Sequence, residues 1–239
     1  MRNRAHLYLV AFMVVSVAAT ESRAGSIDYL TNQSADYIRT FTRNASTDAV
    51  DIVAHNPAGT TFLPKDGLYL SLSGQTVLKN FSITYKDEEY GADDTTPFLP
   101  SFFAAWKWNN LAVFGAFTVP AGGGSLTYEK GVPFLYPLSL MVPDKDGTGL
   151  PKNGHFEGSS MYLAGTVGAA YKLFDLVSVS AAARILSAKK EYIGSALFET
   201  KEAGLEASKS ALGVGGIFGI HVRPFKYLDF GIRFETPTA

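Results

Sequence analysis

The strongest constraint in this sequence is a series of segments, from about Gly67 onward, in which apolar and polar residues alternate with a period of two. The clearest of them closes the chain, with Leu228, Phe230, Ile232 and Phe234 alternating with Asp229, Gly231, Arg233 and Glu235. Successive side chains of a β-strand point to opposite faces, so this alternation predicts strands with one apolar and one polar face. No stretch after residue 19 approaches the run of about 18 apolar residues that a membrane-spanning helix needs. We therefore expect an all-β fold.

The pattern predicts seven strands that are separated by links of two kinds. The strands are expected at Gly67–Tyr85, Phe98–Trp108, Leu111–Val119, Ser160–Leu173, Leu176–Lys189, Ser210–Arg223 and Tyr227–Thr236. Tight turns are expected at Asn109-Asn110, Phe174-Asp175 and Phe225-Lys226, and long polar loops at about Pro120–Gly158 and Lys189–Ser208. Short turns on one side and long loops on the other are typical of outer-membrane β-barrels. A soluble β-sandwich has the alternation without this difference between its two sides.

Aromatic residues flank the expected turns, and basic residues precede them. The aromatic residues are Trp106, Trp108, Tyr171, Phe174, Phe225 and Tyr227, and the basic ones are Lys107, Lys172 and Arg223. Aromatic side chains concentrate where a membrane meets water, so these residues predict an aromatic girdle at one membrane interface. The alternation places the three basic residues on the opposite face of the sheet, where water reaches them. These features together predict an antiparallel transmembrane β-barrel.

The N-terminus has the three-part layout of a secretory signal. Two arginines precede an apolar run, Leu7–Ala19, and a small-x-small cleavage site, Ser22-Arg23-Ala24, stands before Gly25. The apolar run is too short to span a membrane, which disfavours an N-terminal anchor. We therefore expect cleavage after Ala24 and localisation in a bacterial outer membrane.

The composition excludes several classes of function. The chain has 239 residues and no cysteine, which removes disulfides, thiol catalysis and thiolate zinc sites. Its formal net charge is −1, so nothing favours a nucleic acid partner. The four histidines are scattered (His6, His55, His155 and His221), and we expect neither a metal nor another cofactor. The segment 144–149 begins like a calcium loop but lacks the closing Glu, and it is interpreted as a solvated loop.

About 40 residues without a strand pattern, Gly25–Asp66, precede the first expected strand. Within Ser34–His55, apolar residues at helical spacing predict one or two short helices, with Ser46-Thr47-Asp48 as an N-cap. Asn56-Pro57 should end the helix, because proline supplies no N–H donor and disfavours a helical residue before it. Such a segment beside a large barrel is expected to fill the lumen as a plug. We call Gly25–Asp66 the hatch.

Three parts of the chain share a pattern with a known family. They are the hatch residues Asn32-Gln33-Ser34, Tyr37, Arg39, Arg43–Asp48 and His55-Asn56-Pro57-Ala58-Gly59, the hairpin residues Trp108–Val113 with Val119–Gly122, and the last strand Asp229–Thr238. They resemble the long-chain fatty acid outer-membrane transporter family (FadL-type), which includes relatives that import toluene and other aromatic hydrocarbons. The resemblance implies a fourteen-stranded barrel, plugged by the hatch, with a lateral opening beside an inward kink in the third strand.

The expected strands make up about half of such a barrel. An odd number of strands also leaves an unpaired edge, which lipid does not tolerate. We therefore expect this chain to be a fragment of a longer reading frame. The expected organisation is a signal peptide (1–24), the hatch (25–66) and a partial barrel (67–239).

Three residues are candidates for contact with a ligand. Arg184 faces the lumen, where its guanidinium could bind a fatty-acid carboxylate. The alternative is an ion pair with Glu235, Asp229 or a hatch aspartate. Phe103 and Phe114 either line an apolar path or pack as core against the hatch.

Two further motifs are candidates for structural roles in transport. The hatch motif Asn56-Pro57-Ala58-Gly59 should hold the hatch to the barrel wall, because small residues allow close approach and the Asn56 amide can satisfy buried backbone groups. Pro120 cannot donate to a β-ladder, and Gly122 and Gly123 add no side chains, so strand pairing should fail near 118–124 and leave a lateral exit. The alternative is that these residues only end the strand.

The function that these features favour is outer-membrane transport of hydrophobic small molecules, with long-chain fatty acids as the first candidate. Aromatic hydrocarbon uptake, a nonselective porin and an outer-membrane lipase that uses His155 or His221 are the alternatives. We expect no enzymatic activity and no cofactor. The expected partners are the hydrophobic ligand and outer-membrane lipid, and the expected oligomeric state is a monomer.

Overall fold

The structure is a computed structural model that describes residues 34–39, 43–85, 87–132, 153–198 and 201–238. All of these residues belong to one compact unit, Thr31–Ala239. The predicted signal peptide, residues 1–24, and the calcium-like segment, residues 144–149, lie outside the described residues.

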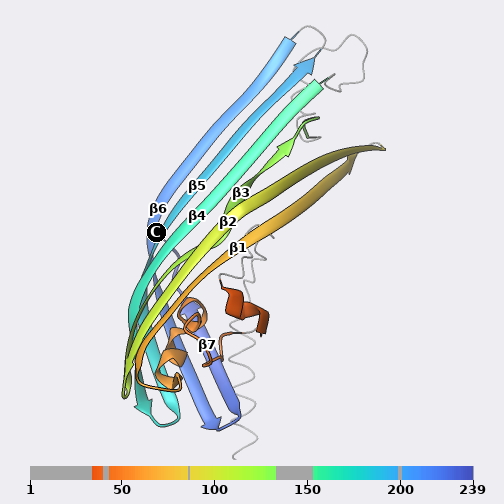
Figure 1. Ribbon diagram of the computed structural model, residues 1–239. Coiled ribbons are helices and arrows are strands. Elements are labelled where there is room, and N and C mark those ends of the chain that lie inside the picture. Colours follow the sequence, from red (N-terminus) through yellow and green to blue (C-terminus); the bar gives the residue numbers. More distant parts are fainter. Residues whose placement is uncertain (1–33, 40–42, 86, 133–152, 199–200, 239) are drawn as a thin grey trace, which may run out of the picture. The chain divides into compact units, whose positions relative to one another are not determined.

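Within the described chain, seven antiparallel strands form one sheet and follow one another in sequence order (Figure 1). They are β1 (Gly67–Tyr85), β2 (Glu88–Trp108), β3 (Leu111–Tyr128), β4 (Asn153–Phe174), β5 (Val177–Phe198), β6 (Lys201–Phe225) and β7 (Leu228–Glu235). Two-residue turns at Asn109-Asn110, Asp175-Leu176 and Lys226-Tyr227 close three hairpins. We call this side of the sheet the turn end and the opposite side the loop end. The all-β fold, the seven strands and the first turn are confirmed, while the other two turns lie one residue later than predicted.

Several strands are longer at the loop end than predicted. The prediction of a long loop at residues 189–208 is wrong, because β5 and β6 pair without a break from Val177↔Val222 to Phe198↔Lys201. The predicted start of the second strand at Phe98 is also wrong, since Glu88 already pairs with Tyr85 across β1 and β2. Both faces of these parts carry charged residues, so the alternation that predicts a strand is absent and the sequence indicated loops. Backbone pairing does not need alternation where neither face is packed against an apolar surface.

The two faces of the sheet differ in what covers them. On one face, apolar side chains stand exposed along the strands, including Leu68, Leu70, Leu72, Val167, Phe230 and Ile232. On the other face, the hatch packs at the turn end. We call these the outer face and the inner face. Because exposed apolar patches of this extent are rare on soluble monomers, the outer face has the character of a surface that contacts another apolar phase.

The described part of the hatch contains three short helical elements. They are η2 (Ala35–Arg39), α2 (Ile52–His55) and η3 (Pro57–Phe62), where η marks a 3₁₀ helix. The predicted cap at Ser46-Thr47-Asp48 is wrong, because α2 begins three residues later and follows Asp51, whose side chain makes no capping hydrogen bond. The predicted break at Asn56-Pro57 is confirmed. Asn56 is extended (φ −139°, ψ 95°), and Pro57 then starts η3 at a position that needs no N–H donor. No helix among the described residues is long and apolar enough to cross a membrane.

Buried residues of the inner face form two separate clusters. The turn-end core joins hatch and strand residues (Val50, Ile52, Val53, Ala54, Leu63, Phe103, Ala105, Phe114 and Ala170). The loop-end cluster joins residues of β2 to β5 and the segment after β3 (Tyr90, Ala92, Tyr128, Val132, Phe156 and Ala196). The hatch is therefore packed at one end of the strands, and a mainly aromatic cluster joins the strands at the other.

Candidate functional site

The candidate site is the contact between the hatch and the inner face of the sheet, and its apolar part is the turn-end core. Ile52 and Val53 of α2 are fully buried, and Phe103 of β2 and Phe114 of β3 belong to the same cluster. Each buried side chain of this size contributes roughly 1.5–3 kcal/mol to the association of hatch and sheet. Phe103 and Phe114 thus occupy the position of core residues beneath the hatch, the second of the two roles considered for them.

The Asn56 side chain joins the hatch to β6. Its amide nitrogen Nδ2 donates to the backbone oxygens of Asn44 (2.9 Å) and Ile220 (3.0 Å). Its oxygen Oδ1 accepts from the backbone N–H of Ala58 (3.3 Å). Asn56 is 1% exposed, so its side-chain amide is buried, and these three backbone groups are its hydrogen-bond partners. In the structure the motif Asn56-Pro57-Ala58-Gly59 therefore lies at the contact between hatch and sheet.

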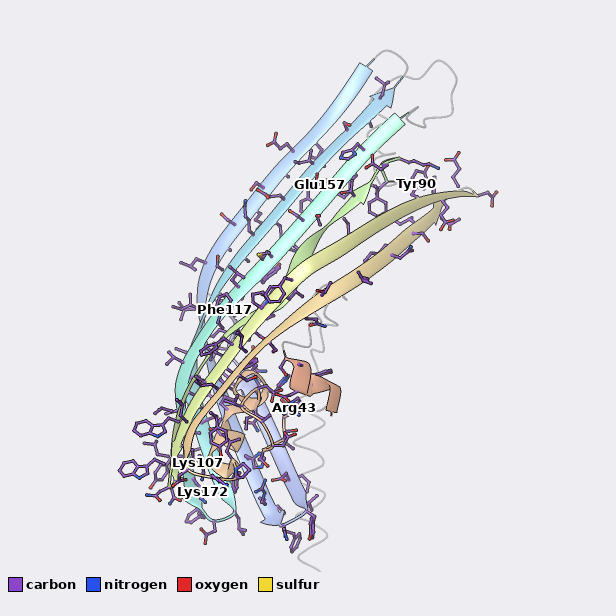
Figure 2. The ribbon with its side chains drawn as sticks, in the orientation of Figure 1. Arg43, Tyr90, Lys107, Phe117, Glu157 and Lys172 are labelled. Atoms are coloured by element: carbon purple, nitrogen blue, oxygen red, sulfur yellow. The ribbon has the colours of Figure 1, made fainter. Side chains whose placement is uncertain are left out.

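The β6–β7 hairpin supplies a second set of contacts to the hatch. Arg223 Nη2 donates to Thr47 Oγ1 (2.5 Å), and Arg223 Nε donates to Asp229 Oδ1 (2.8 Å). The Arg223 guanidinium also lies 4.8 Å from the ring centre of Phe62, the last residue of η3, and Lys172 Nζ lies 5.6 Å from the same ring. Cations over an aromatic face are attracted by its quadrupole. Lys107, Lys172 and Arg223 lie together at the turn end on the inner face, as the alternation predicted; Figure 2 labels the two lysines.

A third contact ties the end of the hatch to β2. Lys107 Nζ donates to Asp66 Oδ1 (2.7 Å), and the backbone N–H of Asn109 donates to Asp66 Oδ2 (2.9 Å). The Lys107 hydrogen bond is the main cause that lowers the pKa of the Asp66 carboxyl group, and the Asn109 hydrogen bond adds to it. Asp66 directly precedes β1, so this contact fixes the point at which the hatch becomes sheet.

The hatch also contains a buried ion pair of its own. Arg43 Nη2 donates to Asp51 Oδ1 (2.6 Å) and to Asp48 Oδ1 (2.8 Å), and Ser34 Oγ donates to Asp51 Oδ2 (2.6 Å). The side chains of Arg43 and Asp51 are both fully buried. Removing one partner of such a pair leaves an uncompensated buried charge. The pair therefore couples the start of the described hatch to the turn before α2.

Sequence reasoning did not find Phe62, Asp66, Asp229 or Thr47 as hatch contacts. Their partners lie 41 residues away for Asp66 and 176 for Thr47. A local pattern carries no signal for such pairs. The only local hint was the position of Asp66, an acidic residue directly before an expected strand.

The Arg184 guanidinium forms an ion pair with Glu235 on the inner face. Its Nη1 donates to Glu235 Oε1 (3.2 Å), and its Nη2 forms a second, shorter contact with Glu235 Oε2. Arg233 also pairs with Glu235, so two guanidinium groups share one carboxylate. This is the ion pair that the sequence offered as the alternative to ligand binding. A ligand carboxylate would have to replace Glu235 or join it.

The residues of the predicted lateral exit lie in a distorted part of β3. The pairing of β3 with β4 does not fail there, contrary to the prediction, but continues to Tyr128↔Phe156 through two register shifts, at Thr118/Ala121 and Gly122/Gly124. Pro120 and Gly123 are among the residues left out of the register. Gly122 (φ 67°) and Gly123 (φ 91°) take left-handed conformations that suit glycine. The predicted end of the strand at Val119 is therefore wrong, because the bulges absorb the residues that cannot pair.

Pairing does fail on the other side of β3. The register between β2 and β3 runs from Trp108↔Leu111 to Phe102↔Phe117, and none follows in the described remainder of either strand. Beyond this point β2 pairs with β1, and β3 pairs with β4. We call the unpaired stretch, residues 88–101 of β2 and 118–128 of β3, the β2–β3 break. Pro120, Gly122 and Gly123 all lie within it.

The geometry of the serine and histidine residues bears on the lipase alternative. His221 Nε2 lies 2.7 Å from Asp229 Oδ1, whereas the histidine of a Ser-His-Asp triad binds its aspartate through Nδ1. The third member is not in place, since His221 Nδ1 and the buried Ser180 Oγ each lack a hydrogen-bond partner among the described atoms. The described residues also contain no group of three or more His, Asp or Glu side chains that could hold a metal ion.

The turn end of the outer face carries the predicted aromatic residues. Trp106, Trp108, Tyr171, Phe174, Phe225 and Tyr227 are all exposed, from 50% for Tyr171 to 89% for Tyr227. An aromatic side chain that merely edges a core would be partly covered. The six residues instead border the exposed apolar strip on the outer face.

The fold and the site together define a class of structure: an antiparallel all-β sheet with an apolar outer face and a short-helix hatch packed on its inner face. No family model and no curated protein matches the chain. A solved structure described as the CymD monoaromatic hydrocarbon channel is similar to it, with a TM-score of 0.40 and 13% sequence identity. The similarity covers 80% of this chain and 65% of that channel, so this chain spans less than two thirds of the channel's length.

Proposed function

We propose that this chain forms part of an outer-membrane channel for hydrophobic small molecules, with two candidate substrate classes, long-chain fatty acids and uncharged aromatic hydrocarbons. The observation that carries the proposal is the outer face. Its apolar side chains are exposed, and the aromatic residues at the turn end stand where a girdle at the membrane surface would lie. In lipid this surface costs nothing to expose, whereas in water it would drive association.

The inner face supports a selective channel over a nonselective porin. A porin keeps a water-filled and charged lumen. Here α2 and η3 fill the turn end of the inner face, and buried apolar residues and hydrogen bonds hold them there. Passage through the turn end would require the hatch to leave. A route that avoids the hatch would run sideways through the β2–β3 break, where Pro120, Gly122 and Gly123 interrupt the regular ladder.

Arg184 bears on the choice between two substrate classes. A fatty-acid carboxylate would bind its guanidinium through charge-assisted hydrogen bonds. The pairing of Arg184 with Glu235 favours the second candidate, an uncharged aromatic hydrocarbon, because that ligand needs no free cation.

Uptake assays with oleate and toluene test the proposal and separate the two substrates. Cells that express the complete reading frame should take up at least one of these compounds, while cells without it should not. Arg184→Gln should lower oleate uptake and spare toluene if Arg184 holds the carboxylate. Lys189→Gln is the matched control, because Lys189 is exposed and pairs only with its neighbour Glu191 in the described structure. A large, steady single-channel conductance without uptake of either compound would contradict the proposal and indicate a porin.

A further inference from the structure

The β2–β3 break is bounded at both ends. At its turn end, Phe102↔Phe117 is the last pair of the ladder, and Figure 2 shows Phe117 partway along the strands. At its loop end, Tyr90 of β2 belongs to the same buried cluster as Tyr128 of β3 and Phe156 of β4. The ring centres of Tyr128 and Phe156 are 6.5 Å apart. Side-chain packing thus brings β2 and β3 together again where backbone hydrogen bonds do not.

One side chain of β2 bridges to β3 within the break. Leu99 is 6% exposed although its strand has no backbone partner on that side. A methyl group placed on Gly123 would overlap Cδ2 of Leu99, so the Leu99 side chain lies directly over the Gly123 backbone. The same position on Gly123 lies 3.5 Å from Cγ1 of Val119. Leu99 of β2 is therefore packed onto the bulged part of β3.

The Leu99 backbone is paired with β1, whereas the Leu99 side chain is held by apolar contacts alone. Leu99 pairs with Gln75 of β1, next to the register shift between Gln75 and Val77. Leucine has no polar atoms, so dispersion and burial alone keep its side chain over Gly123. Such a contact is open to a change of rotamer, because no hydrogen bond has to break. Rotamer changes are also fast compared with any movement of a strand.

We propose that Leu99 is the side chain that seals the β2–β3 break and sets the size of the hydrophobic molecule that passes through it. This inference rests on the proposed function. An apolar solute on the inner face that enters the break at Gly123 has to displace Leu99. The solute replaces the contacts that Leu99 loses, so the exchange favours apolar molecules over polar ones. The space released by one leucine side chain limits how bulky the solute can be.

The test changes the volume of residue 99 and measures the uptake of solutes of increasing width. Leu99→Ala should raise the uptake of a bulky hydrocarbon such as biphenyl severalfold relative to toluene. Leu99→Trp should lower the uptake of both. Leu99→Val, a milder change, should give an intermediate rise and guards against a folding defect in the alanine variant. Leu186→Ala is the matched control, since Leu186 lies on β5, paired with Ala164 and Gly213 away from the break.

The outcomes separate this inference from the proposed function. If the unchanged protein takes up none of oleate, toluene and biphenyl, the proposed function fails. Uptake of oleate alone would keep the proposed function and overturn the inference, because no hydrocarbon would then pass Leu99. If the unchanged protein takes up toluene but the ratio of biphenyl to toluene uptake is the same in all three Leu99 variants, Leu99 does not seal the route. An equal rise in that ratio for Leu186→Ala would also overturn the inference, because any widening of the inner face would then suffice.

Discussion

The turn end and the loop end of this sheet differ in how β2 and β3 are joined. At the turn end every strand is hydrogen-bonded to its neighbours, and the hatch residues Asn56, Asp66 and Thr47 form further hydrogen bonds with the sheet. At the loop end β2 and β3 share no backbone hydrogen bonds within the described strands, and an aromatic cluster joins them. Directional polar contacts fix a position, whereas apolar contacts can exchange partners at little cost. The comparison therefore indicates a fixed turn end and an adjustable loop end.

The hatch bridges β2 and β6 at the turn end. Its last residue, Asp66, is bonded to Lys107 of β2, and Asn56 and Thr47 are bonded to β6. No covalent link joins the hatch to β6. Loss of those contacts would free one end of the hatch, while Asp66 and the chain itself would retain the other.

The largest effect is expected from Arg43→Ala, which breaks the buried ion pair of the hatch. Asp51 would be left as a buried charge without its cation, at a cost of about 3–5 kcal/mol. Hydrogen exchange should show loss of protection over residues 43–66, while β4 and β5 keep theirs. Lys189→Ala removes an exposed pair and should change stability by less than about 1 kcal/mol. Unchanged protection of the hatch in Arg43→Ala would show that the turn end does not depend on this pair.

Acid should weaken the turn end through His55. Burial, with smaller contributions from Arg233 and Arg43 and against the opposing charge of Asp51, lowers the pKa of His55 from its usual 6.5 to about 4. The unfolded hatch therefore binds a proton between about pH 6.5 and 4 that the folded hatch does not. His55 therefore leaves the free energy of unfolding unchanged above about pH 6.5. As the pH falls toward 4, protonation of His55 in the unfolded hatch lowers that free energy by at most about 3 kcal/mol.

Limited proteolysis of the hatch as a function of pH measures this effect. Cleavage within residues 43–66 should increase below about pH 6. The sheet should still be folded at that pH, as measured by the difference in electrophoretic mobility between unheated and heated samples. His55→Phe, which cannot be protonated and retains a ring beside Tyr37, should flatten this dependence. A pH profile that is identical in His55→Phe would assign the transition to other groups.

Asn56→Ala should release the β6 side of the hatch at a cost of about 1–3 kcal/mol. The change leaves the buried backbone groups of Asn44, Ala58 and Ile220 without this partner. Single-channel conductance should rise, and protease should reach the hatch, while the sheet stays folded. Asn44→Ala is the matched control, because Asn56 bonds only the backbone oxygen of Asn44, which the substitution keeps. Equal conductance in both variants would count against the motif as an anchor.

The smallest effect is expected at the loop end, from Phe156→Leu. This change removes the ring contacts of Phe156 with Tyr128 and Tyr192, at 6.5 and 6.3 Å, and should cost about 1–2 kcal/mol. Hydrogen exchange should become faster in residues 88–92 and 122–128 only. Faster exchange in the hatch as well would show that the two ends are coupled and would contradict the comparison.

Local patterns predicted well wherever one residue's environment follows from its neighbours in sequence. The alternation in Leu228–Glu235 gave the two faces of β7 correctly, and Pro57 marked the break after α2. The same reasoning missed the loop-end half of β6, because the segment 201–209 carries charged residues on both faces. It also assigned Pro120 and the glycines beside it to the end of β3, since a sequence does not reveal that bulges can accommodate them.

The sequence by itself determined the number of strands, their inward and outward faces, the tight turns to within one residue and the break at Asn56-Pro57, because each depends on periodicity or on the backbone limits of proline and glycine. Only the tertiary structure decided which groups meet. Arg184 could have faced a ligand, Asp229 or a hatch aspartate, and its pairing with Glu235 depends on how β5, β6 and β7 align. The β2–β3 break and the position of Leu99 over Gly123 likewise arise from two strands parting, each held by its other neighbour. Such contacts depend on distances between residues far apart in the chain, which no local pattern encodes.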